Sequence, residues 1–454
     1  MSLSLPHRLR GWFGLDRAIL FSIAGRSWSL LSGPVTILLV GTRLTKDEQG
    51  LFYNFFSLLG LQVFLELGFG QCLIQFASHE RAKLELGSDH RLAGDSVALH
   101  RLLSLGRLSL TWYAALAGLF LFLVGGAGHL FFSHHAPRSL VWISPWWLLV
   151  LLAALNLVTQ PFWFLIEGCN QVAFVNGYRL LVQVGISLGL WTTLLLGGRL
   201  FANASAIAAN LSISVAALLL VWWPLVRQIS THSARGASRV LLREIWPFQW
   251  RMAISFASGY LIFSLFTPVM SHLQGLEVGG QMGMTWQLVG ALNLGAAAWI
   301  STKAPRYGML ISERRFADLD ALARRVTLQA VSLSAAGGVV LLLCIAWLQA
   351  HSALGARFLD LPSTAMLVIA TVVNQLITSQ AFYLRAHKQE PFMWLSLANG
   401  VLVAAGVLIL GRRYGALGAC LAYALVQTLL LPFSTAVFRS CRLGWHASSA
   451  LPSS

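Results

Sequence analysis

The sequence of 454 residues is poor in charge, since only 11% of it is Asp, Glu, Lys or Arg while 57% is hydrophobic. A soluble chain usually carries about 25% charged residues, because a water-facing surface needs them. The shortage extends along the whole chain, which excludes a soluble globular protein. The gaps between apolar runs are also too short to hold a folded domain outside a membrane.

The residue patterns of catalytic and metal sites are missing as well. The five cysteines show no CxxC or other metal-ligand spacing, and there is no phosphate-binding loop or nucleophile elbow. We therefore expect no metal, no cofactor, no catalytic residues and no enzyme activity. The connections predicted to face outward hold few carboxylates, namely Asp47, Glu48, Glu277 and Asp360. A membrane glycan polymerase or ligase, the enzyme alternative, would depend on those four.

Long apolar runs are what the sequence has in abundance. Each is long enough to cross about 30 Å of hydrocarbon as a helix. The runs predict twelve membrane spans, at residues 19–42, 51–77, 107–128, 144–165, 178–197, 203–226, 247–270, 281–302, 326–348, 363–384, 391–410 and 415–438. The predicted fold class is an all-α integral membrane protein.

The basic residues lie mainly on one side of these spans. Of the 32 Lys and Arg, 24 lie in the two tails and the even-numbered connections and seven in the odd-numbered connections. Lys and Arg are enriched in cytoplasmic loops, so this asymmetry predicts that both termini are cytoplasmic. It also explains the net charge of +16 without a nucleic-acid partner.

The chain repeats itself at an interval of about half its length. Leu65-Glu66-Leu67-Gly68 returns as Leu292-Asn293-Leu294-Gly295, and Arg26 returns as Arg251. Because six spans are an even number, two six-helix repeats would be parallel, with a substrate cavity between them near the membrane midplane. We expect an N-terminal half at 1–226, a cytoplasmic linker at 227–246 and a C-terminal half at 247–454, a design typical of transporters.

Two arginines and one glutamate are the candidate site residues. Burying a charge inside a span costs at least about 2.5–3.5 kcal/mol, so Arg26 should face a cavity or a partner. Arg26 and its repeat mate Arg251 could hold a phosphate or pyrophosphate headgroup with their guanidinium forks. For Arg251 a headgroup anchor at the membrane surface is an equal alternative. Glu66 is a candidate for ion coupling or for a structural pair with Arg26.

Other signals in the sequence are weaker. Amides in the fourth and tenth spans could bind sugar hydroxyls, although bonds between helices are the commoner role; these are Asn156, Gln160, Asn374, Gln375 and Gln380. Gly33-Pro34 and Gly259 mark matching weak points in the first and seventh spans. Phe316, Leu319, Leu322 and Val326 predict an amphipathic helix on the inner leaflet or, alternatively, belong to a solvated loop.

With twelve spans in two halves, Arg26 in the first span and the turn Asp47-Glu48-Gln49-Gly50-Leu51-Phe52, the chain resembles the polysaccharide-biosynthesis or O-antigen (Wzx-type) flippases. These belong to the multidrug/oligosaccharidyl-lipid/polysaccharide exporter superfamily. The resemblance covers the whole chain with loose motifs. Related peptidoglycan-lipid flippases typically carry two further C-terminal spans, so the oligosaccharide branch is favoured.

The resemblance implies a multi-pass protein of the bacterial inner membrane with a cation-lined cavity and alternating access. The implied activity is transfer of an undecaprenyl-pyrophosphate-linked oligosaccharide from the cytoplasmic to the periplasmic leaflet. The implied partners are the lipid-linked glycan, membrane lipids and other polysaccharide-assembly proteins. The alternative within the superfamily is a drug or metabolite exporter, which should place acidic residues in its cavity.

Overall fold

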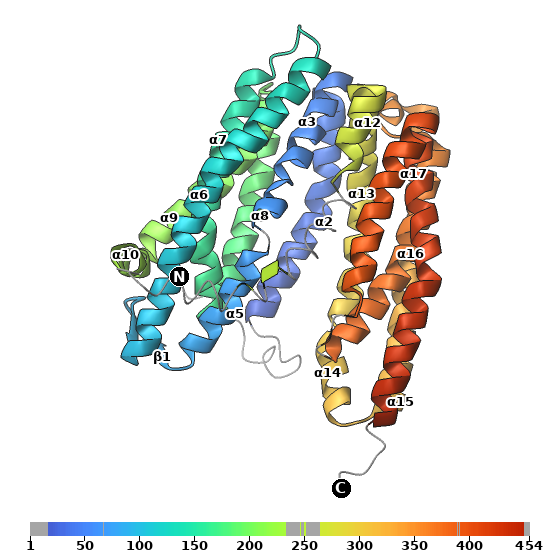
Figure 1. Ribbon diagram of the computed structural model, residues 1–454. Helices are drawn as coiled ribbons and strands as arrows, with labels where there is room; N and C mark the ends of the chain where they lie inside the picture. The colour runs from blue at the N-terminus through green and yellow to red at the C-terminus, as the bar shows by residue number, and fades with distance from the viewer. Residues whose placement is uncertain are drawn as a thin grey trace, which may run out of the picture. The chain divides into compact units, whose positions relative to one another are not determined.

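The protein is almost entirely helical in the computed structural model, which confirms the predicted fold class (Figure 1). The structure describes residues 17–448 except 67, 233–245, 247, 248, 251–263, 388 and 390. The described helices are long because the apolar runs that form them must satisfy every backbone polar group internally within a bilayer.

Most predicted spans correspond to one described helix each. Eight helices of the described residues are long and apolar enough to cross a membrane, or nine if one bent pair counts as a span. The eight are listed here: α2 (Arg17–Arg43), α6 (Ser96–His135), α7 (Ile143–Gly168), α8 (Val172–Leu195), α9 (Phe201–Leu220), α15 (Phe316–His351), α16 (Leu361–Ala386) and α17 (Met393–Ser448).

The second, seventh, eighth, eleventh and twelfth predicted spans do not match one of these eight helices each. The second span is the bent pair of helical segments Lys46–Glu66 and Phe69–Arg81. The eighth is α13 (Leu276–Ser301). The eleventh and twelfth are the two parts of α17, which are separated by the non-helical Gly415 (φ 64°, ψ −146°). The seventh lies largely outside the described residues and is represented by α12 (Phe266–Gln274).

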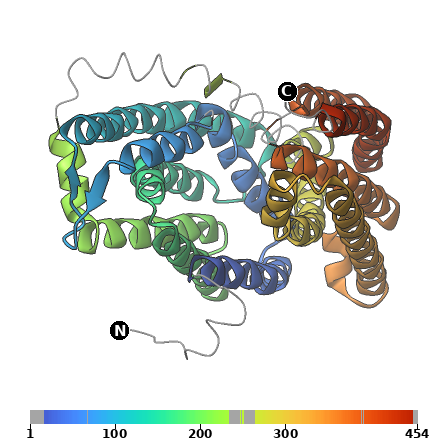
Figure 2. The same cartoon turned by 90° about the horizontal axis from the view of Figure 1, so that it is seen from below.

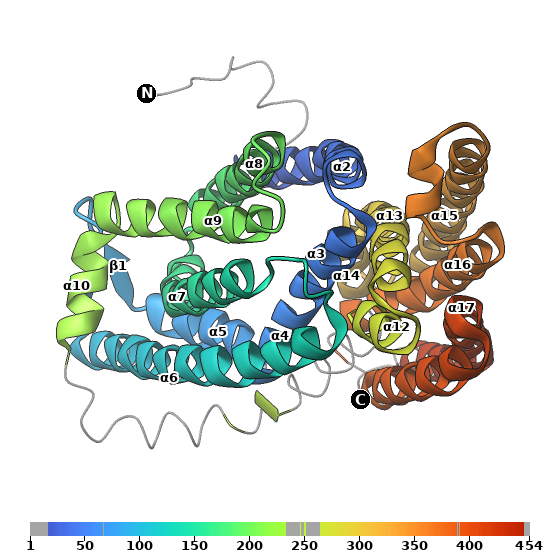
Figure 3. The ribbon, with the colours of Figure 1, turned by 90° about the horizontal axis from the view of Figure 1, so that it is seen from above.

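The chain divides into two compact units, which are considered separately. Unit 1 consists of Met1–Arg43, Leu65–Phe131 and Val141–Ala253. Its described elements include α5 (Phe69–Arg81) and α10 (Trp223–Thr231), and α5 and α7 lie between α6 on one side and α9 on the other (Figure 3). A short antiparallel hairpin, β1 (Leu84–Leu86) and β2 (Leu92–Gly94), lies beside α10 and is held there by Gln228, whose amide bonds both backbone groups of Leu92 (Figure 2).

Unit 2 consists of Leu44–Phe64, Phe132–Leu140 and Ile254–Ser454. It contains α3 (Lys46–Leu59), α14 (Ala304–Ser312) and the short 3-10 helix η1 (Ala353–Arg357) in addition to α12, α13 and α15–α17. The α3 and α13 backbones approach so closely that a Cβ on Gly280 would lie 2.8 Å from the Gly50 nitrogen. Small residues permit such contacts between membrane helices. The Gln49 amide donates to the Gly280 carbonyl at 3.0 Å and joins the two helices.

Residues 316–326 form a helix, as predicted, but its apolar face does not lie on the membrane. This stretch is the first part of the long helix α15. Leu319 and Val326 are fully buried, and Phe316 and Leu322 pack on a core cluster that includes Tyr307, Tyr383 and Phe392. The correction has a simple cause, because the same three- and four-residue spacing suits a protein core as well as a lipid surface.

The Gly33-Pro34 pair does not interrupt the first span. Helix α2 continues through Pro34 from Arg17 to Arg43. Proline is tolerated inside membrane helices because local adjustments satisfy the carbonyl that loses its partner. Gly259 lies outside the described residues.

Candidate functional site

The second span breaks at the predicted site residue Glu66, at the start of the unit 1 segment Leu65–Phe131. Helix α4 (Gln62–Glu66) ends there, α5 starts at Phe69, and the two parts of the span are bent by 47°. Gly68 adopts the left-handed conformation (φ 70°, ψ 15°). Only glycine adopts this conformation without steric cost, so Gly68 allows the chain to turn here.

The polar backbone exposed by this break has a partner from the predicted seventh span. Gln249 is 4% exposed, and its Nε2 donates to the Glu66 carbonyl at 3.4 Å. The Cys72 thiol donates to Gln249 Oε1 at 3.0 Å, which fixes the orientation of the amide. Broken membrane helices are tolerated where neighbouring groups bond the freed carbonyls, and in transporters such breaks commonly form substrate or ion sites.

The Glu66 side chain is half-buried at the edge of an aromatic cluster. Tyr113 is fully buried and lies close enough to Glu66 for an electrostatic interaction. The rings of Trp112, Tyr113 and Phe164 surround the start of α5, with Phe69 at 5.8 Å from Trp112. The Glu66 carboxylate therefore lies near the buried Tyr113 and the other rings around the start of α5.

Arg26 lies on the exposed side of α2. The buried side of this helix packs on α8, where Gly25 meets Gln183 and the Trp28 indole donates to Ser187 Oγ at 3.2 Å. Arg26 is exposed, at about 100° around the helix from Gly25. It is the one charged residue of α2 between Arg17 and Arg43. Its pairing with Glu66 stays a prediction, and Arg251 lies outside the described residues.

Arg179 and Glu167, two further charged residues of unit 1, form an ion pair. Arg179 of α8 donates to both carboxylate oxygens of Glu167 on α7, at 2.6 and 3.3 Å. This pair joins the ends of two consecutive helices across their connecting turn. We therefore assign this ion pair a structural role.

The amides predicted in the tenth span belong to the interior of unit 2. Gln380 donates to Thr435 Oγ1 at 3.0 Å and joins α16 to α17, which favours the role between helices over sugar binding. Gln375 is fully buried, and neither of its amide atoms has a hydrogen-bond partner among the described residues.

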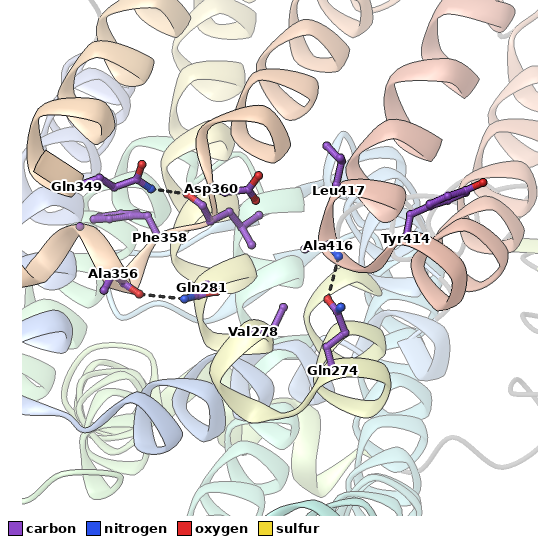
Figure 4. Close-up of a pocket in the computed structure, with 12 residues that line it drawn as sticks. Gln274, Val278, Gln281, Gln349, Ala356, Phe358, Asp360, Tyr414, Ala416 and Leu417 are labelled. Carbon is purple, nitrogen blue, oxygen red and sulfur yellow. Dashed lines mark hydrogen bonds between the residues drawn. The ribbon is translucent and has the colours of Figure 1, made fainter.

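Unit 2 contains a cavity of about 630 Å³ that the sequence did not predict, and its lining residues are drawn in Figure 4. Its amides are already bonded to backbone groups: Gln281 to the Ala356 carbonyl, Gln349 to the Leu359 carbonyl and Gln274 to the Ala416 nitrogen. These bonds tie helix ends and the η1 turn together. We therefore attribute this cavity to the packing of the helix ends and do not assign it a ligand.

Three of the four carboxylates on which an outward-facing enzyme would depend cap helix ends or form an ion pair. Glu48 forms a reciprocal capping box with Thr45, and Asp360 is the N-cap of α16. Glu277 pairs with Lys46. Such caps satisfy backbone donors that have no partner within the helix. Among the described residues no group of three His, Cys, Asp or Glu is placed to hold a metal ion.

Sequence reasoning proposed Glu66 as a candidate site residue, which stays a prediction, and did not predict the bend or its bond with Gln249. The available signals were a glycine directly after the repeated Leu-Glu-Leu and an amide within an apolar run. Both are common in membrane helices, so neither was sufficient to locate a break.

The protein has the fold of known membrane transporters, in which twelve transmembrane helices form two repeats. No protein-family model matches the chain, and no curated protein sequence matches it. Solved structures do, at low sequence identity.

A lipid II flippase, MurJ, in an inward closed conformation is 15% identical, with a TM-score of 0.66 over 94% of this chain and 90% of that chain. An inward-facing multidrug-resistance MATE-family transporter of the MOP superfamily is 13% identical, with a TM-score of 0.57 over 98% of both chains. The eukaryotic MATE transporter AtDTX14 is 12% identical, with a TM-score of 0.60 over 96% of this chain and 99% of that chain. The similarity establishes the fold.

Proposed function

We propose that the protein is a transporter that moves an undecaprenyl-pyrophosphate-linked oligosaccharide from the cytoplasmic to the periplasmic leaflet by alternating access. It acts without a cofactor and is not an enzyme. It resides in the bacterial inner membrane with both termini in the cytoplasm, and it works with other polysaccharide-assembly proteins.

The observation that carries this proposal is the charge of α2. Arg26 is the one charge between the two ends of that helix and is exposed on the side away from α8. An arginine inside a span is costly, so it is retained for a partner or a ligand. Its planar fork suits the oxygens of a pyrophosphate, with Arg251 as a second ligand from the repeat.

The fold supports the same conclusion. The similar structure with a TM-score of 0.66 is named as a lipid II flippase, so the substrate in its name is a lipid. The break beside Glu66 provides a point at which the second span can bend, as alternating access requires. A role for Glu66 in ion coupling, or in a pair with Arg26, belongs to this proposal.

A drug or metabolite exporter is the second candidate, because two of the similar structures are named as MATE transporters. A cation exporter should present carboxylates where this chain presents Arg26. The polymerase or ligase alternative loses support, since Glu48, Glu277 and Asp360 have structural partners.

Complementation of a flippase-deficient bacterial strain that makes the cognate glycan tests the proposal. Wild type should clear the lipid-linked intermediate from the cytoplasmic face. Arg26→Ala should leave it trapped with a loss of transport of about tenfold or more, since one lost charge-assisted contact is worth about 1.5–3 kcal/mol. Arg26→Lys keeps the positive charge but lacks the planar guanidinium, so its transport should lie between that of wild type and that of Arg26→Ala.

Arg43→Ala is the matched control, because Arg43 lies on the same helix and is exposed at its end. It should transport like wild type, and immunoblots of membranes should show equal insertion of all variants. If wild type leaves the cognate intermediate untouched, the flippase proposal is wrong and the exporter becomes the leading candidate.

A further inference from the structure

A second cavity of unit 2, of about 620 Å³, lies between α15, α16 and α17. Sites for small ligands commonly have this size. The flippase proposal makes no use of it. Its main polar lining residues are Asp320, Arg324, Tyr383 and Arg442, and its main apolar ones are Leu328, Leu376 and Phe438.

The main polar residues of this cavity lie toward one end of the three helices and the main apolar residues lie further along them. On α15, Asp320 and Arg324 come before Leu328, and on α17, Phe438 comes one turn before Arg442. On α16 the lining runs from Leu376 to Tyr383 at the helix end. The Tyr383 hydroxyl donates to Asp320 Oδ1 at 2.7 Å, which places the polar ends of α15 and α16 together.

The polar end carries more positive than negative charge. Asp320 is the single carboxylate among the lining residues, against the two guanidinium groups of Arg324 and Arg442. The excess of one positive charge matches the single negative charge of a phosphodiester.

Arg442 is held in place but is not satisfied by Asp320. Its Nε lies 3.7 Å from Asp320 Oδ2, which is beyond hydrogen-bond distance, and this buried Nε has no hydrogen-bond partner among the described residues. A buried cationic donor in this condition is costly. An anion in the cavity would offset the charge of this guanidinium and accept hydrogen bonds from its other two nitrogens.

The apolar end opens toward the lipid-facing side of α15. Leu328 is 59% exposed, and only 17% of the most apolar window of α15 is buried in the protein. The cationic end is the one that the distribution of basic residues predicts to be cytoplasmic. Anionic phospholipids are concentrated in that leaflet, and basic pockets between helices there bind their headgroups.

We propose that this cavity is a binding site for an anionic phospholipid of the inner leaflet. Arg324 and Arg442 bind the phosphodiester oxygens, and an acyl chain lies along Leu328, Leu376 and Phe438. The ligand is a resident lipid of the surrounding bilayer, distinct from the transported substrate.

Lipid titration of the full-length protein in detergent, read by native mass spectrometry, tests this site. The probes are phosphatidylglycerol and phosphatidylcholine with identical acyl chains. Wild type should prefer phosphatidylglycerol by about tenfold, since basic residues at a membrane surface each add to the attraction. The double variant Arg324→Gln/Arg442→Gln should reduce that preference to less than about threefold.

The matched control is Arg325→Gln/Arg439→Gln, which removes the same charge from the same two helices. Both residues are exposed and lie outside the lining of the cavity. The control should keep the full preference. An equal loss in the control, or equal binding of both lipids by wild type, overturns the proposal.

Two further arms keep the test decisive. Glycerol 3-phosphate has the headgroup chemistry without acyl chains, and full displacement of phosphatidylglycerol by it would overturn the lipid assignment in favour of a soluble phosphate ligand. If the double variant does not fold, Arg324→Gln alone replaces it, because Arg324 is exposed. Its preference should fall below that of Arg325→Gln, and equality of the two contradicts the site.

Discussion

The two copies of one short sequence have different structures in the two units. Leu65-Glu66-Leu67-Gly68 includes the end of α4, and the span bends there by 47°. Its repeat, Leu292-Asn293-Leu294-Gly295, lies inside the continuous helix α13. Gly68 has a positive φ of 70°, whereas Gly295 is an ordinary helical residue.

The difference shows that the local sequence permits a break but does not impose one. In unit 1 the break is stabilised by Gln249, which bonds the Glu66 carbonyl. In unit 2, α13 is continuous, and its first half packs on α3, where Tyr53 donates to Gln287 at 3.0 Å. A bend in a membrane helix requires a partner for the freed carbonyl. We infer that the second span can change its shape at this break.

The largest expected effect is that of replacing each glycine by alanine. Gly68→Ala places a side chain in the left-handed region, which costs about 1–2 kcal/mol. Gly295→Ala meets no atom within 4 Å and should stabilise the helix by about 0.5–1 kcal/mol. Thermal unfolding in detergent should therefore shift in opposite directions. Transport should decline only in Gly68→Ala, and equal shifts would contradict the contrast.

The next effect comes from the partner of the break. Gln249→Leu leaves the Glu66 carbonyl without its side-chain donor and should lower the free energy of unfolding by about 1 kcal/mol or more. The control is Asn293→Leu, because Asn293 Oδ1 is buried without a hydrogen-bond partner among the described residues. Denaturant titration should find that control neutral or stabilising. A neutral Gln249→Leu would show that the break needs no cap.

A smaller effect distinguishes the two roles of Glu66. If Glu66 and Arg26 form a structural pair, the variants Glu66→Gln and Arg26→Gln should couple by about 1 kcal/mol in a double-mutant cycle of stability. Asn293, the repeat mate, should show no such coupling with Arg26. Additive single effects together with loss of the pH dependence of transport in Glu66→Gln would contradict pairing and favour ion coupling.

The smallest effect is expected at Pro34, where the sequence predicts an interruption and the structure has a continuous helix. Pro34→Ala restores a backbone donor in a helix that is already formed. Its thermal unfolding should rise slightly and its transport should be unchanged. A loss of transport comparable to that of Gly68→Ala would show that the first span also bends.

The ends of α7 and α8 in unit 1 lie within about six residues of the predicted spans, because hydrophobicity alone largely determines them. The predicted span 144–165 is α7 (Ile143–Gly168), and 178–197 corresponds to α8 (Val172–Leu195). The span 107–128 is only part of α6, which begins at Ser96. A hydrophobic run marks the length inside the bilayer, whereas a helix continues beyond it as long as its first turns find packing partners.

The sequence by itself determined that this is a membrane protein of twelve spans, because apolar runs of that length are stable only in a bilayer as helices. It also singled out Arg26 and Glu66 as candidate site residues, because charges within such runs are rare, and their roles stay predictions. The tertiary structure decided where a span breaks, through the bond from Gln249 to the Glu66 carbonyl. It likewise decided that residues 316–326 pack on protein and that Arg324 and Arg442 line one cavity. Those outcomes depend on residues far apart in the chain, and their periodicity is the same whichever partner covers them.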